Sequence, residues 1–562
     1  MTHSKTPGFE PFMQTAQRIE LFDTTLRDGA QTAGISFSVK DKIRIAERLA
    51  DFGIDWIEGG WPGASPKDDL FFEQMRQRNW RHSKLVAFGS TARPGHAVHK
   101  DQGLNRLIGS GADAICIFGK SWDVHVTTAL NITLDENLAL VRESIAFLKQ
   151  HVDTVFFDAE HFFDGFGANE SYALQVLEAA AEAGADTLVL CDTNGGSIPF
   201  PVFDVVTRVK QHLPEQKLGI HTHNDCEMSV ANSVAAVRAG VQQVQGTING
   251  VGERCGNANL ISIIPILQLK VGIDCGISDQ QLTRLSSLSQ FVNEMANRLP
   301  WQHQPFVGQN AFAHKGGIHV SAIRKQRSLY EHIDPALVGN GQRILVSDQA
   351  GRSNILSKLQ QLEPDTGIDP ANPMVTEALK RIKELEASGY AFEGADASFQ
   401  LLLRRSMQRF QRHFELVRFR VFDEKRGHEL SSESEATVQV RVGGRLKHAA
   451  ALGNGPVNAM DKALRAALVD AYPGLESMFL TDFKVRVLTT REATEAAVRV
   501  LIESSDGTRK WNTVGVSTDV LEATYRALND AIEYKLVMDQ VPPPETENGR
   551  TVRKRHPEST KS

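Results

Sequence analysis

Residues 184–193 have the sequence Gly-Ala-Asp-Thr-Leu-Val-Leu-Cys-Asp-Thr, and units of this kind decide the fold class. The middle of the unit is a continuous apolar run, which is typical of a parallel strand buried on both faces. The glycine before the run ends the preceding helix. Similar turns stand before two other apolar runs, at Gly53-Ile54-Asp55 and Gly111-Ala112-Asp113.

Runs of this kind recur along the first half of the chain, with room for one helix between neighbours. The sequence predicts eight strands, at Ile19–Thr25, Trp56–Gly60, Lys84–Ser90, Ala114–Gly119, Thr154–Glu160, Thr187–Thr193, Lys217–Asp225 and Gln242–Gly250. Eight strand–helix units within residues 19–280 predict a (β/α)8 TIM barrel, the catalytic domain of an α/β protein. A doubly wound open sheet is the competing fold, but it usually has fewer strands and a glycine-rich first turn.

The rest of the chain predicts two further folded parts and two tails. Residues 281–412 predict a mostly helical intermediate subdomain, with helices at Leu282–Asn297 and Thr376–Ser388. Residues 413–541 predict an α+β domain of two tandem βββα units, because three strand-like runs and a helix occur twice in succession. We expect the sheets of these units to pack against each other. Residues 1–18 are expected to be an N-terminal tail, and the proline-rich and then basic residues 542–562 a disordered one.

The duplicated domain has its expected elements at regular positions. The first unit comprises strands at Leu416–Phe422, Thr437–Val442 and Leu446–Leu452 and a helix at Pro456–Ala471. The second comprises strands at Phe483–Leu488, Ala497–Glu503 and Lys510–Ser517 and a helix at Asp519–Leu536. Neither unit could bury its sheet alone, so the two are expected to form one domain.

Composition places the chain among ordinary globular proteins. Of its 562 residues, 41% are hydrophobic and 23% are charged, and the formal net charge is −6. That charge gives no basic field for nucleic acid, and no run of about 18 apolar residues predicts a membrane span. Five cysteines are too few for a disulfide scaffold, and residues 1–18 lack the features of an export signal. We therefore expect a reduced, cytoplasmic protein.

Polar side chains gather where two of the predicted strands end, and the C-terminal ends of barrel strands face the active site. The first strand leads into Arg27-Asp28, and the seventh contains His221-Thr222-His223. Two histidines at positions i and i+2 of a strand point to the same face. Together with the Asp28 carboxylate they would form a two-histidine, one-carboxylate site for a divalent metal that also binds substrate. Asn257, in the glycine-rich run after the eighth strand, could add an amide oxygen.

Three other residues at this rim are candidates for catalysis or binding. The Arg27 guanidinium could hold a carbonyl oxygen that gains negative charge, or it could simply pair with Glu58 or Glu160. Glu160 closes the fifth strand and is a candidate acid or base. Thr193 closes the sixth strand, and its hydroxyl could bind a substrate carboxylate or make an ordinary strand-end hydrogen bond.

These motifs resemble a known family. The runs Asp23-Thr24-Thr25-Leu26-Arg27-Asp28-Gly29, His221-x-His223-Asn224-Asp225 and Gly252-Glu253-Arg254-x-Gly256-Asn257 are similar to the signature set of the DRE-TIM metallolyases. Within that superfamily they resemble the Claisen-condensing 2-isopropylmalate synthase and homocitrate synthase family. The segment Phe312–His319 and the duplicated C-terminal domain are also similar to that family, so the resemblance covers nearly the whole chain. It implies an acyltransferase that condenses acetyl-CoA with a 2-oxoacid and carries a LeuA-type allosteric domain.

Two stretches narrow the choice of substrate. Residues 58–68 and 345–354 are most similar to the family members that condense pyruvate with acetyl-CoA, as the first step of a threonine-independent route to isoleucine. The main alternative is a member that acts on 2-oxoisovalerate and forms 2-isopropylmalate.

Two remoter alternatives stay open. A lyase of the hydroxymethylglutaryl-CoA type normally uses a cysteine in a glycine-rich loop, and Cys255 lies in such a loop. The loop here reads Gly-Glu-Arg-Cys-Gly-Asn rather than Gly-Gly-Cys-Pro, which argues against that lyase. The other is a non-catalytic amino-acid sensor with a relic barrel, against which the intact metal motif argues.

The resemblance implies roles for individual residues at the metal and the 2-oxoacid. It implies a divalent ion, of which Mn²⁺, Mg²⁺, Zn²⁺ and Co²⁺ all stay open, bound by four side chains: Asp28, His221, His223 and Asn257. Arg27 would stabilise the alkoxide that forms as the enolate of acetyl-CoA attacks pyruvate, and Thr193 would hold the pyruvate carboxylate.

The resemblance leaves the base that removes the acetyl methyl proton undecided. The candidates are Glu160, His319 and Tyr330, the last two contributed by the neighbouring subunit of a homodimer. The resemblance also implies an amino-acid effector, expected to be isoleucine, that binds between the two βββα units.

Overall fold

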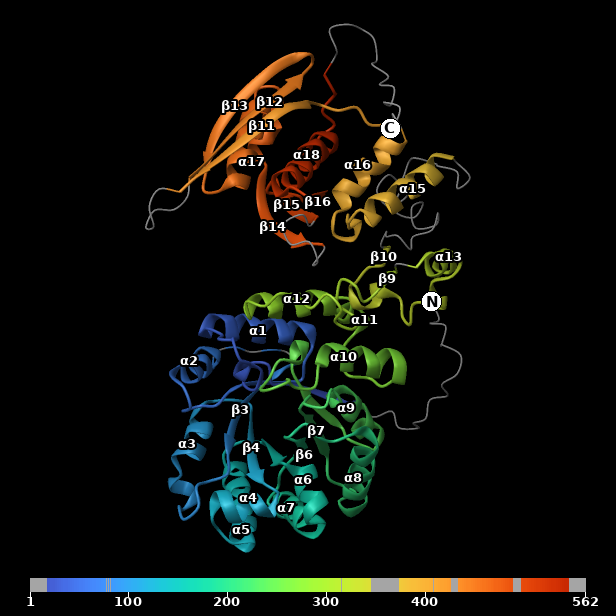
Figure 1. Ribbon diagram of the computed structural model, residues 1–562. Helices are drawn as coiled ribbons and strands as arrows, with labels where there is room; N and C mark the ends of the chain where they lie inside the picture. Colours follow the sequence, from blue (N-terminus) through green and yellow to red (C-terminus); the bar gives the residue numbers. More distant parts are fainter. Residues whose placement is uncertain are drawn as a thin grey trace. The chain divides into compact units, whose positions relative to one another are not determined.

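The computed structural model describes residues 18–344 and 373–544, apart from residues 77, 79, 81, 315, 408, 426–432 and 489–496. The chain divides into two compact units (Figure 1). The first comprises residues 1–312 and 331–343, and the second comprises residues 313–330 and 344–562. The predicted tails and the stretch at residues 345–354 lie almost entirely outside the described residues.

Eight parallel strands of the first unit close into a barrel in sequence order (Figure 1). The strands are β1 (Glu20–Asp23), β2 (Trp56–Gly60), β3 (Lys84–Ser90), β4 (Ala114–Lys120), β5 (Thr154–Glu160), β6 (Thr187–Asp192), β7 (Leu218–Thr222) and β8 (Gln243–Gly246). Strand β8 pairs with β1 and closes the ring. The predicted TIM barrel is confirmed, with β1, β7 and β8 shorter than expected.

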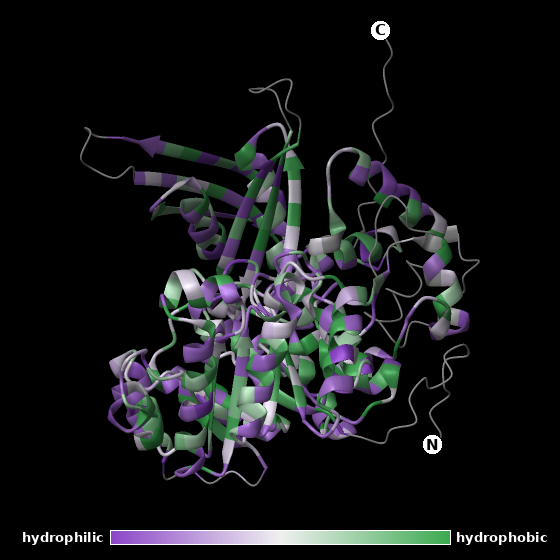
Figure 2. Ribbon diagram, turned by 90° about the horizontal axis from the view of Figure 1, so that it is seen from below, coloured by the Kyte–Doolittle hydropathy of each residue, from purple (hydrophilic) through white to green (hydrophobic). Residues whose placement is uncertain are grey.

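Helices follow the barrel strands and cover them. The main ones are α1 (Val39–Phe52), α2 (Pro66–Met75), α3 (Gln102–Gly109), α5 (Leu134–Lys149), α7 (Glu170–Glu182), α8 (Pro199–His212), α9 (Ser229–Arg238) and α10 (Leu260–Pro265). Further helices of this unit are α4 (Asp123–His125), α6 (Phe162–Ala168), α11 (Asp279–Leu282) and α12 (Leu285–Met295). In Figure 2 the helices carry both hydrophobic and hydrophilic residues, as expected of helices with one buried side. Within the described part of the chain, no helix is long and apolar enough to span a membrane.

Local signals explain where these helices begin and end. Helix α1 starts at a capping box in which the Ser38 hydroxyl accepts from the Asp41 amide and the Asp41 carboxylate accepts from the Ser38 amide. It ends at Gly53, whose φ of 104° lies in the left-handed region that glycine adopts most easily. Gly184 ends α7 in the same way, with a φ of 92°. The glycine turns predicted before the strands are therefore present.

The barrel interior is a packed aromatic and aliphatic core that supports the mouth. Phe156 makes edge contacts with Phe22 and Trp56, at ring-centre distances of 5.6 and 4.9 Å. Cys116 is fully buried in this interior, and Cys191 is also buried, as expected of small core residues. The strands are buried on both faces, so the side chains at their C-terminal ends are held by a rigid floor.

The second unit contains the predicted duplication. Strands β11 (Glu415–Glu424), β12 (Glu433–Val442) and β13 (Arg445–Gly453) form one antiparallel sheet with α17 (Pro456–Leu468). Strands β14 (Phe479–Val487), β15 (Val498–Ser505) and β16 (Lys510–Ser517) form the other with α18 (Val520–Met538). The unit also contains α13 (Gly317–Lys325), α15 (Pro373–Ala387) and α16 (Asp396–Ser406). The two-residue strands β9 (Ala313–His314) and β10 (Arg343–Ile344) lie where the chain passes between the units.

The expectation that the two sheets pack against each other is wrong. Helices α17 and α18 contact each other instead, and each covers its own sheet. The second sheet is apolar on both faces: Trp511 packs with the α17–α18 core, whereas Val514 and Val516 pack with α15 and α16. Helices occupy both faces of this sheet, so neither face is left for the other sheet.

Candidate active site

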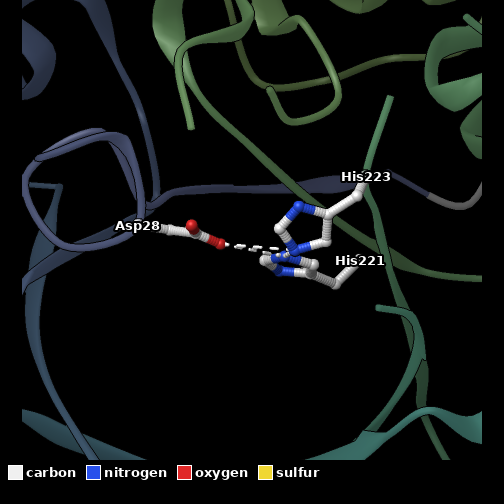
Figure 3. A group of neighbouring side chains, drawn as sticks. All are labelled: Asp28, His221 and His223. Carbon is white, nitrogen blue, oxygen red and sulfur yellow. Dashed lines mark hydrogen bonds and ion pairs between the residues drawn. The ribbon is translucent and has the colours of Figure 1, made fainter. Parts of the chain in front are cut away.

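The three predicted metal ligands meet at the C-terminal rim of the barrel (Figure 3). Asp28 lies in the turn after β1, His221 lies on β7, and His223 follows that strand. Asp28 Oδ2 is 3.3 Å from His221 Nε2 and 3.6 Å from His223 Nε2, and the two Nε2 atoms are 3.4 Å apart. All three residues are buried. The turn that carries Asp28 is held by hydrogen bonds from the Arg27 and Gly29 amides to the Thr24 carbonyl oxygen.

The His221 ring is held by a neighbouring strand. Its Nδ1 lies 2.8 Å from Gln245 Oε1, and the Gln245 amide nitrogen donates to Asp158 Oδ1 at 3.3 Å. Because Gln245 Oε1 can only accept, His221 Nδ1 carries the hydrogen of this bond, and Nε2 is the ring nitrogen that faces Asp28 and His223. Such a partner behind a histidine is typical of metal sites, where it sets the tautomer and the ring orientation.

The fourth predicted ligand lies beside His223. A β-bridge pairs His223 with Asn257, so the loop after β8 brings the Asn257 side chain to the same rim. Asn257 Oδ1 and His223 Nδ1 are buried and have no hydrogen-bond partner among the described residues. A buried amide oxygen without a partner is costly, so a group that the amide oxygen could bind is expected here.

Two of the three residues in this cluster, Asp28 and His223, have pKa values that suit cation binding. Burial alone would raise the pKa of Asp28, but the adjacent Arg27 guanidinium and the hydrogen bond with His221 hold it well below its usual range. Burial and the neighbouring His221 lower the pKa of His223 to about 4, so this ring is neutral at pH 7. Burial also opposes the charged form of His221, but the hydrogen bond with Asp28 outweighs it and raises the pKa.

The arrangement fits a divalent metal. One ionised carboxylate and two imidazole nitrogens lie close enough to contact one ion, and metal binding needs these ligands without their protons. The partnerless Asn257 oxygen supplies a further neutral donor. Two histidines and one carboxylate leave coordination positions for substrate, which is the arrangement of a catalytic rather than a structural metal site.

Arg27 lies next to this cluster and is fixed from two sides. Its Nε donates to Glu58 Oε2 at 2.7 Å, and the Thr24 hydroxyl donates to the same carboxylate oxygen. Its guanidinium carbon lies 3.7 Å from the centre of the Phe88 ring. From the sequence, Arg27 could either act in catalysis or simply pair with a carboxylate. The structure shows that it pairs with Glu58. Because Nη1 still lies 3.6 Å from Asp28, both roles are compatible.

An aromatic wall stands beside Arg27. The rings of Phe88 and Phe118 stack at 5.6 Å, and Trp61 meets both edge-on at 5.6 and 5.9 Å. A cavity of about 450 Å³ opens next to this wall. Its lining includes Arg27, Trp61, Lys42 and Lys67. The rim therefore offers an apolar surface and a cationic cavity close to the proposed metal ligands.

Glu160 and Thr193 lie at the ends of neighbouring strands. The Glu160 carboxylate pairs with Lys120, at the end of β4. The Thr193 hydroxyl oxygen accepts from the His161 amide at 2.9 Å, which leaves its own proton free to be donated. The Arg254 guanidinium binds the Thr193 carbonyl oxygen at 2.7 Å. Thr193 thus has the strand-end hydrogen bond that sequence analysis named as an alternative, and it keeps a donor for a substrate.

His319 and Tyr330 belong to the second unit. Their rings stack with centres 4.3 Å apart, and Tyr330 is exposed. Their proposed role at the active site of a neighbouring subunit stays a prediction. Cys255, which the lyase alternative would use, is exposed in its loop.

Sequence analysis missed three residues that complete the rim: Gln245, Asp158 and Lys120. Each lies two positions along a strand from another residue and so faces the same side of the sheet as that residue: Gln245 from Gln243, Asp158 from Glu160, and Lys120 from Phe118. Burial and the nearby Glu58 charge raise the pKa of Asp158 to about 6, against the opposing effect of His221. Strand parity could have marked these residues as inward-facing, but not their partners.

Comparison with known families matches the same division of the chain. The HMGL-like family matches residues 18–291, and the homocitrate synthase post-HMGL domain-like family matches residues 306–389. The LeuA allosteric (dimerisation) domain matches residues 393–536. The first match spans the barrel, and the third spans the duplicated α+β fold.

Individual relatives match the chain over nearly its whole length. The (R)-citramalate synthase of Aquifex aeolicus is 52% identical over 525 residues, which cover 93% of this chain and 99% of the relative. The (R)-citramalate synthase of Geobacter sulfurreducens is 53% identical over 518 residues, covering 92% of this chain and 97% of the relative. A 2-isopropylmalate synthase of Methanocaldococcus jannaschii is 30% identical over 515 residues, covering 92% and 94%. The chain therefore belongs to the family of the (R)-citramalate synthases and the 2-isopropylmalate synthases.

Proposed function

We propose that this protein is an (R)-citramalate synthase, which condenses pyruvate with acetyl-CoA and water to give citramalate and CoA. The observation that carries the proposal is the meeting of Asp28, His221 and His223 beside a fixed Arg27 at the barrel rim. The choice of pyruvate is supported by the higher identity to (R)-citramalate synthases than to the 2-isopropylmalate synthase.

The metal site would be formed by Asp28, His221, His223 and Asn257. The chemistry that a bound divalent cation supplies here is Lewis-acid polarisation of the ketone of the 2-oxoacid. Gln245 orients His221 for binding, and Arg27 compensates the Asp28 charge. The donor set of nitrogen and oxygen atoms is compatible with Mn²⁺, Mg²⁺, Zn²⁺ or Co²⁺.

Arg27 and Thr193 would bind the 2-oxoacid. Arg27 donates to the ketone oxygen, which becomes an alkoxide when the new carbon–carbon bond forms. Because Glu58 and Phe88 already hold the guanidinium, it need not reorganise as that charge develops. The free Thr193 proton is directed to the pyruvate carboxylate.

Glu160 would be the base that creates the nucleophile. It takes a proton from the acetyl methyl group, and the electron pair of that C–H bond becomes the enolate that attacks the ketone carbon. A proton then reaches the alkoxide, and water cleaves the thioester to release CoA. We favour Glu160 over His319 and Tyr330 because it lies on the same rim as the proposed metal ligands.

The 450 Å³ cavity beside Arg27 supports the placement of acetyl-CoA. Its lining contributes Lys42 and Lys67, and positive charge suits the phosphates of CoA. Lys42 is itself paired with Asp68, so Lys67, whose amino group bonds the Ser36 hydroxyl at 3.2 Å, is the more available cation.

A two-acceptor assay tests the proposed reaction. Release of free CoA is measured with pyruvate and with 2-oxoisovalerate at equal concentrations, each with and without a chelator. We expect release with pyruvate, a clear preference over 2-oxoisovalerate, and loss of release on chelation. A preference for the branched acid would replace the proposal by 2-isopropylmalate synthesis, and turnover unaffected by chelation would contradict the metal site.

We also propose a homodimer that isoleucine inhibits. The match to a LeuA allosteric (dimerisation) domain supports both. Strand β14 adds support, because Phe479, Val485 and Val487 are all exposed on it, as expected of a surface that a second copy covers. Light scattering should give twice the mass of one chain, and added isoleucine, but not alanine, should lower CoA release. Inhibition by neither amino acid would contradict this effector assignment.

A further inference from the structure

We propose that Lys120 is a positioning residue that holds the Glu160 carboxylate for removal of the acetyl methyl proton. This inference rests on the proposed function, because it takes Glu160 as the base. Lys120 lies at the end of β4 and Glu160 at the end of β5, and the two residues stand opposite each other in the parallel ladder. Their side chains form an ion pair between Lys120 Nζ and Glu160 Oε2.

The backbone on both sides of this pair is fixed. The Ser121 hydroxyl donates to the Glu160 carbonyl oxygen at 2.7 Å, and the Asn137 amide donates to the Lys120 carbonyl oxygen at 2.9 Å. The Asn137 amide also donates to the Tyr172 hydroxyl oxygen at 2.8 Å. The ion pair therefore starts from two strand ends that cannot shift easily.

The pair belongs to the interior of the barrel mouth rather than to the outer surface. Every second side chain of β4 faces the barrel interior, and these include Cys116, Phe118 and Lys120. Lys120 Nζ lies 5.5 Å from the centre of the Phe118 ring. The side chains of Lys120 and Glu160 are 20% and 23% exposed. They are thus shielded enough to keep one geometry and open enough to reach a substrate.

The hydrogen-bonding pattern leaves Glu160 ready to accept a proton. Lys120 binds only Oε2, and among the described residues Oε1 makes no hydrogen bond. An ammonium on one oxygen fixes the plane of the carboxylate, so the other oxygen can point at the acetyl methyl group. The residue after Glu160 is His161, whose amide orients the Thr193 hydroxyl. One short segment therefore aims both the base and the group proposed to hold pyruvate.

A different role for Lys120 would use the same location. Its ammonium could leave Glu160 and bind the carboxylate of the 2-oxoacid directly. The two roles predict different kinetics, because a substrate ligand affects mainly KM for the acceptor, whereas a residue that orients the base affects the proton-transfer step.

The test compares Lys120→Met with Lys120→Arg and with the control Lys149→Met. Lys149 forms a similar partly exposed ion pair with Asp186 near the opposite end of β5, away from the mouth. We expect Lys120→Met to lower kcat by about 10- to 100-fold, with little change in KM for pyruvate. The kinetic isotope effect on kcat with trideuteroacetyl-CoA should rise, because proton removal becomes rate-limiting. Lys120→Arg should recover part of kcat, and Lys149→Met should resemble the wild-type protein.

Each other outcome has a definite meaning. A higher KM for pyruvate with an unchanged isotope effect would assign Lys120 to substrate binding and overturn the inference, as would a Lys120→Met variant that behaves like Lys149→Met. Circular dichroism and bound-metal content check that the variants remain folded. Absence of CoA release by the wild-type protein with either acceptor would instead refute the proposed function, and the inference with it, before any variant is compared.

Discussion

Two buried histidine clusters, one in each unit, differ in how completely their hydrogen bonds are satisfied. In the second unit, His413 Nδ1 lies 2.7 Å from Glu533 Oε2, and His413 Nε2 lies 2.9 Å from the Val541 carbonyl oxygen. In the barrel, His223 Nδ1 has no partner among the described residues, and its Nε2 faces a second imidazole and a carboxylate. The first cluster is complete in itself, whereas the second needs a further group.

The two clusters also differ in charge. Burial opposes the charged form of His413, but the hydrogen bond with Glu533 outweighs it and raises the pKa. His223 lies at the other extreme, with a pKa lowered to about 4 by burial and by His221. His413 is thus stabilised by its own carboxylate, Glu533, whereas His223 stays neutral at pH 7. Both histidines are buried, so burial does not distinguish His413 from His223. They differ in that both ring nitrogens of His413 have a hydrogen-bond partner, whereas His223 Nδ1 has none among the described residues.

Asp28→Asn should have the largest effect. It removes the charge that compensates a bound cation but leaves the shape of the site, so we expect loss of stoichiometric metal and a fall in kcat of about a thousandfold or more. Metal content after gel filtration and CoA release measure the two effects. Full activity of Asp28→Asn would contradict the claim that the barrel cluster needs a bound cation, because this cluster would then need no further group, like the His413 cluster.

Gln245→Ala should have the next largest effect. It removes the acceptor that orients His221, and residues behind a metal ligand typically change metal affinity by about 10- to 100-fold. Metal titration followed by calorimetry measures the affinity. Gln216→Ala is the matched control, since the Gln216 side-chain amide donates to the carbonyl oxygens of Ala185 and Asp186 before β6. Equal metal affinity in the two variants would show that Gln245 does not support the site.

Glu533→Gln should affect stability rather than chemistry. Glu533 accepts from the His413 ring and from the His413 amide, and the Tyr472 hydroxyl donates to the His413 carbonyl oxygen. Loss of the charge should lower the free energy of unfolding of the second unit by about 1–3 kcal/mol. Urea denaturation measures this change, and metal affinity should stay at the wild-type value. A large loss of metal affinity would contradict the assignment of His413 as structural.

The pH dependence of stability should give the smallest effect. Because the folded pKa of His413 is raised, its contribution is fully present below the unfolded value of about 6.5 and is lost as pH rises through the folded value. The free energy of unfolding of the second unit should therefore fall across that range, and the fall should be absent in Glu533→Gln. An equal fall in both proteins would assign the pH dependence to another group.

Much of the barrel could be predicted from the sequence, because its signals are local. The apolar run of β6 and the glycine turn at Gly184 lie within a few residues of each other, and His221 and His223 share a face because they are two positions apart. The arrangement of the second unit was harder to predict. Val514 and Trp511 point to opposite faces of β16, so both faces are apolar, and the local pattern does not show whether a sheet or a helix covers each.

Local patterns in the sequence specify the eight-stranded barrel, the duplicated C-terminal units and the residue types of the metal site. The partners that complete that site are set by the way the strands pair in the folded protein. His221 meets Gln245 because β7 and β8 pair in that register, and Lys120 meets Glu160 because β4 and β5 do. Such pairs are 24 and 40 positions apart in the chain, so their contact depends on strand register and barrel closure and not on any local pattern.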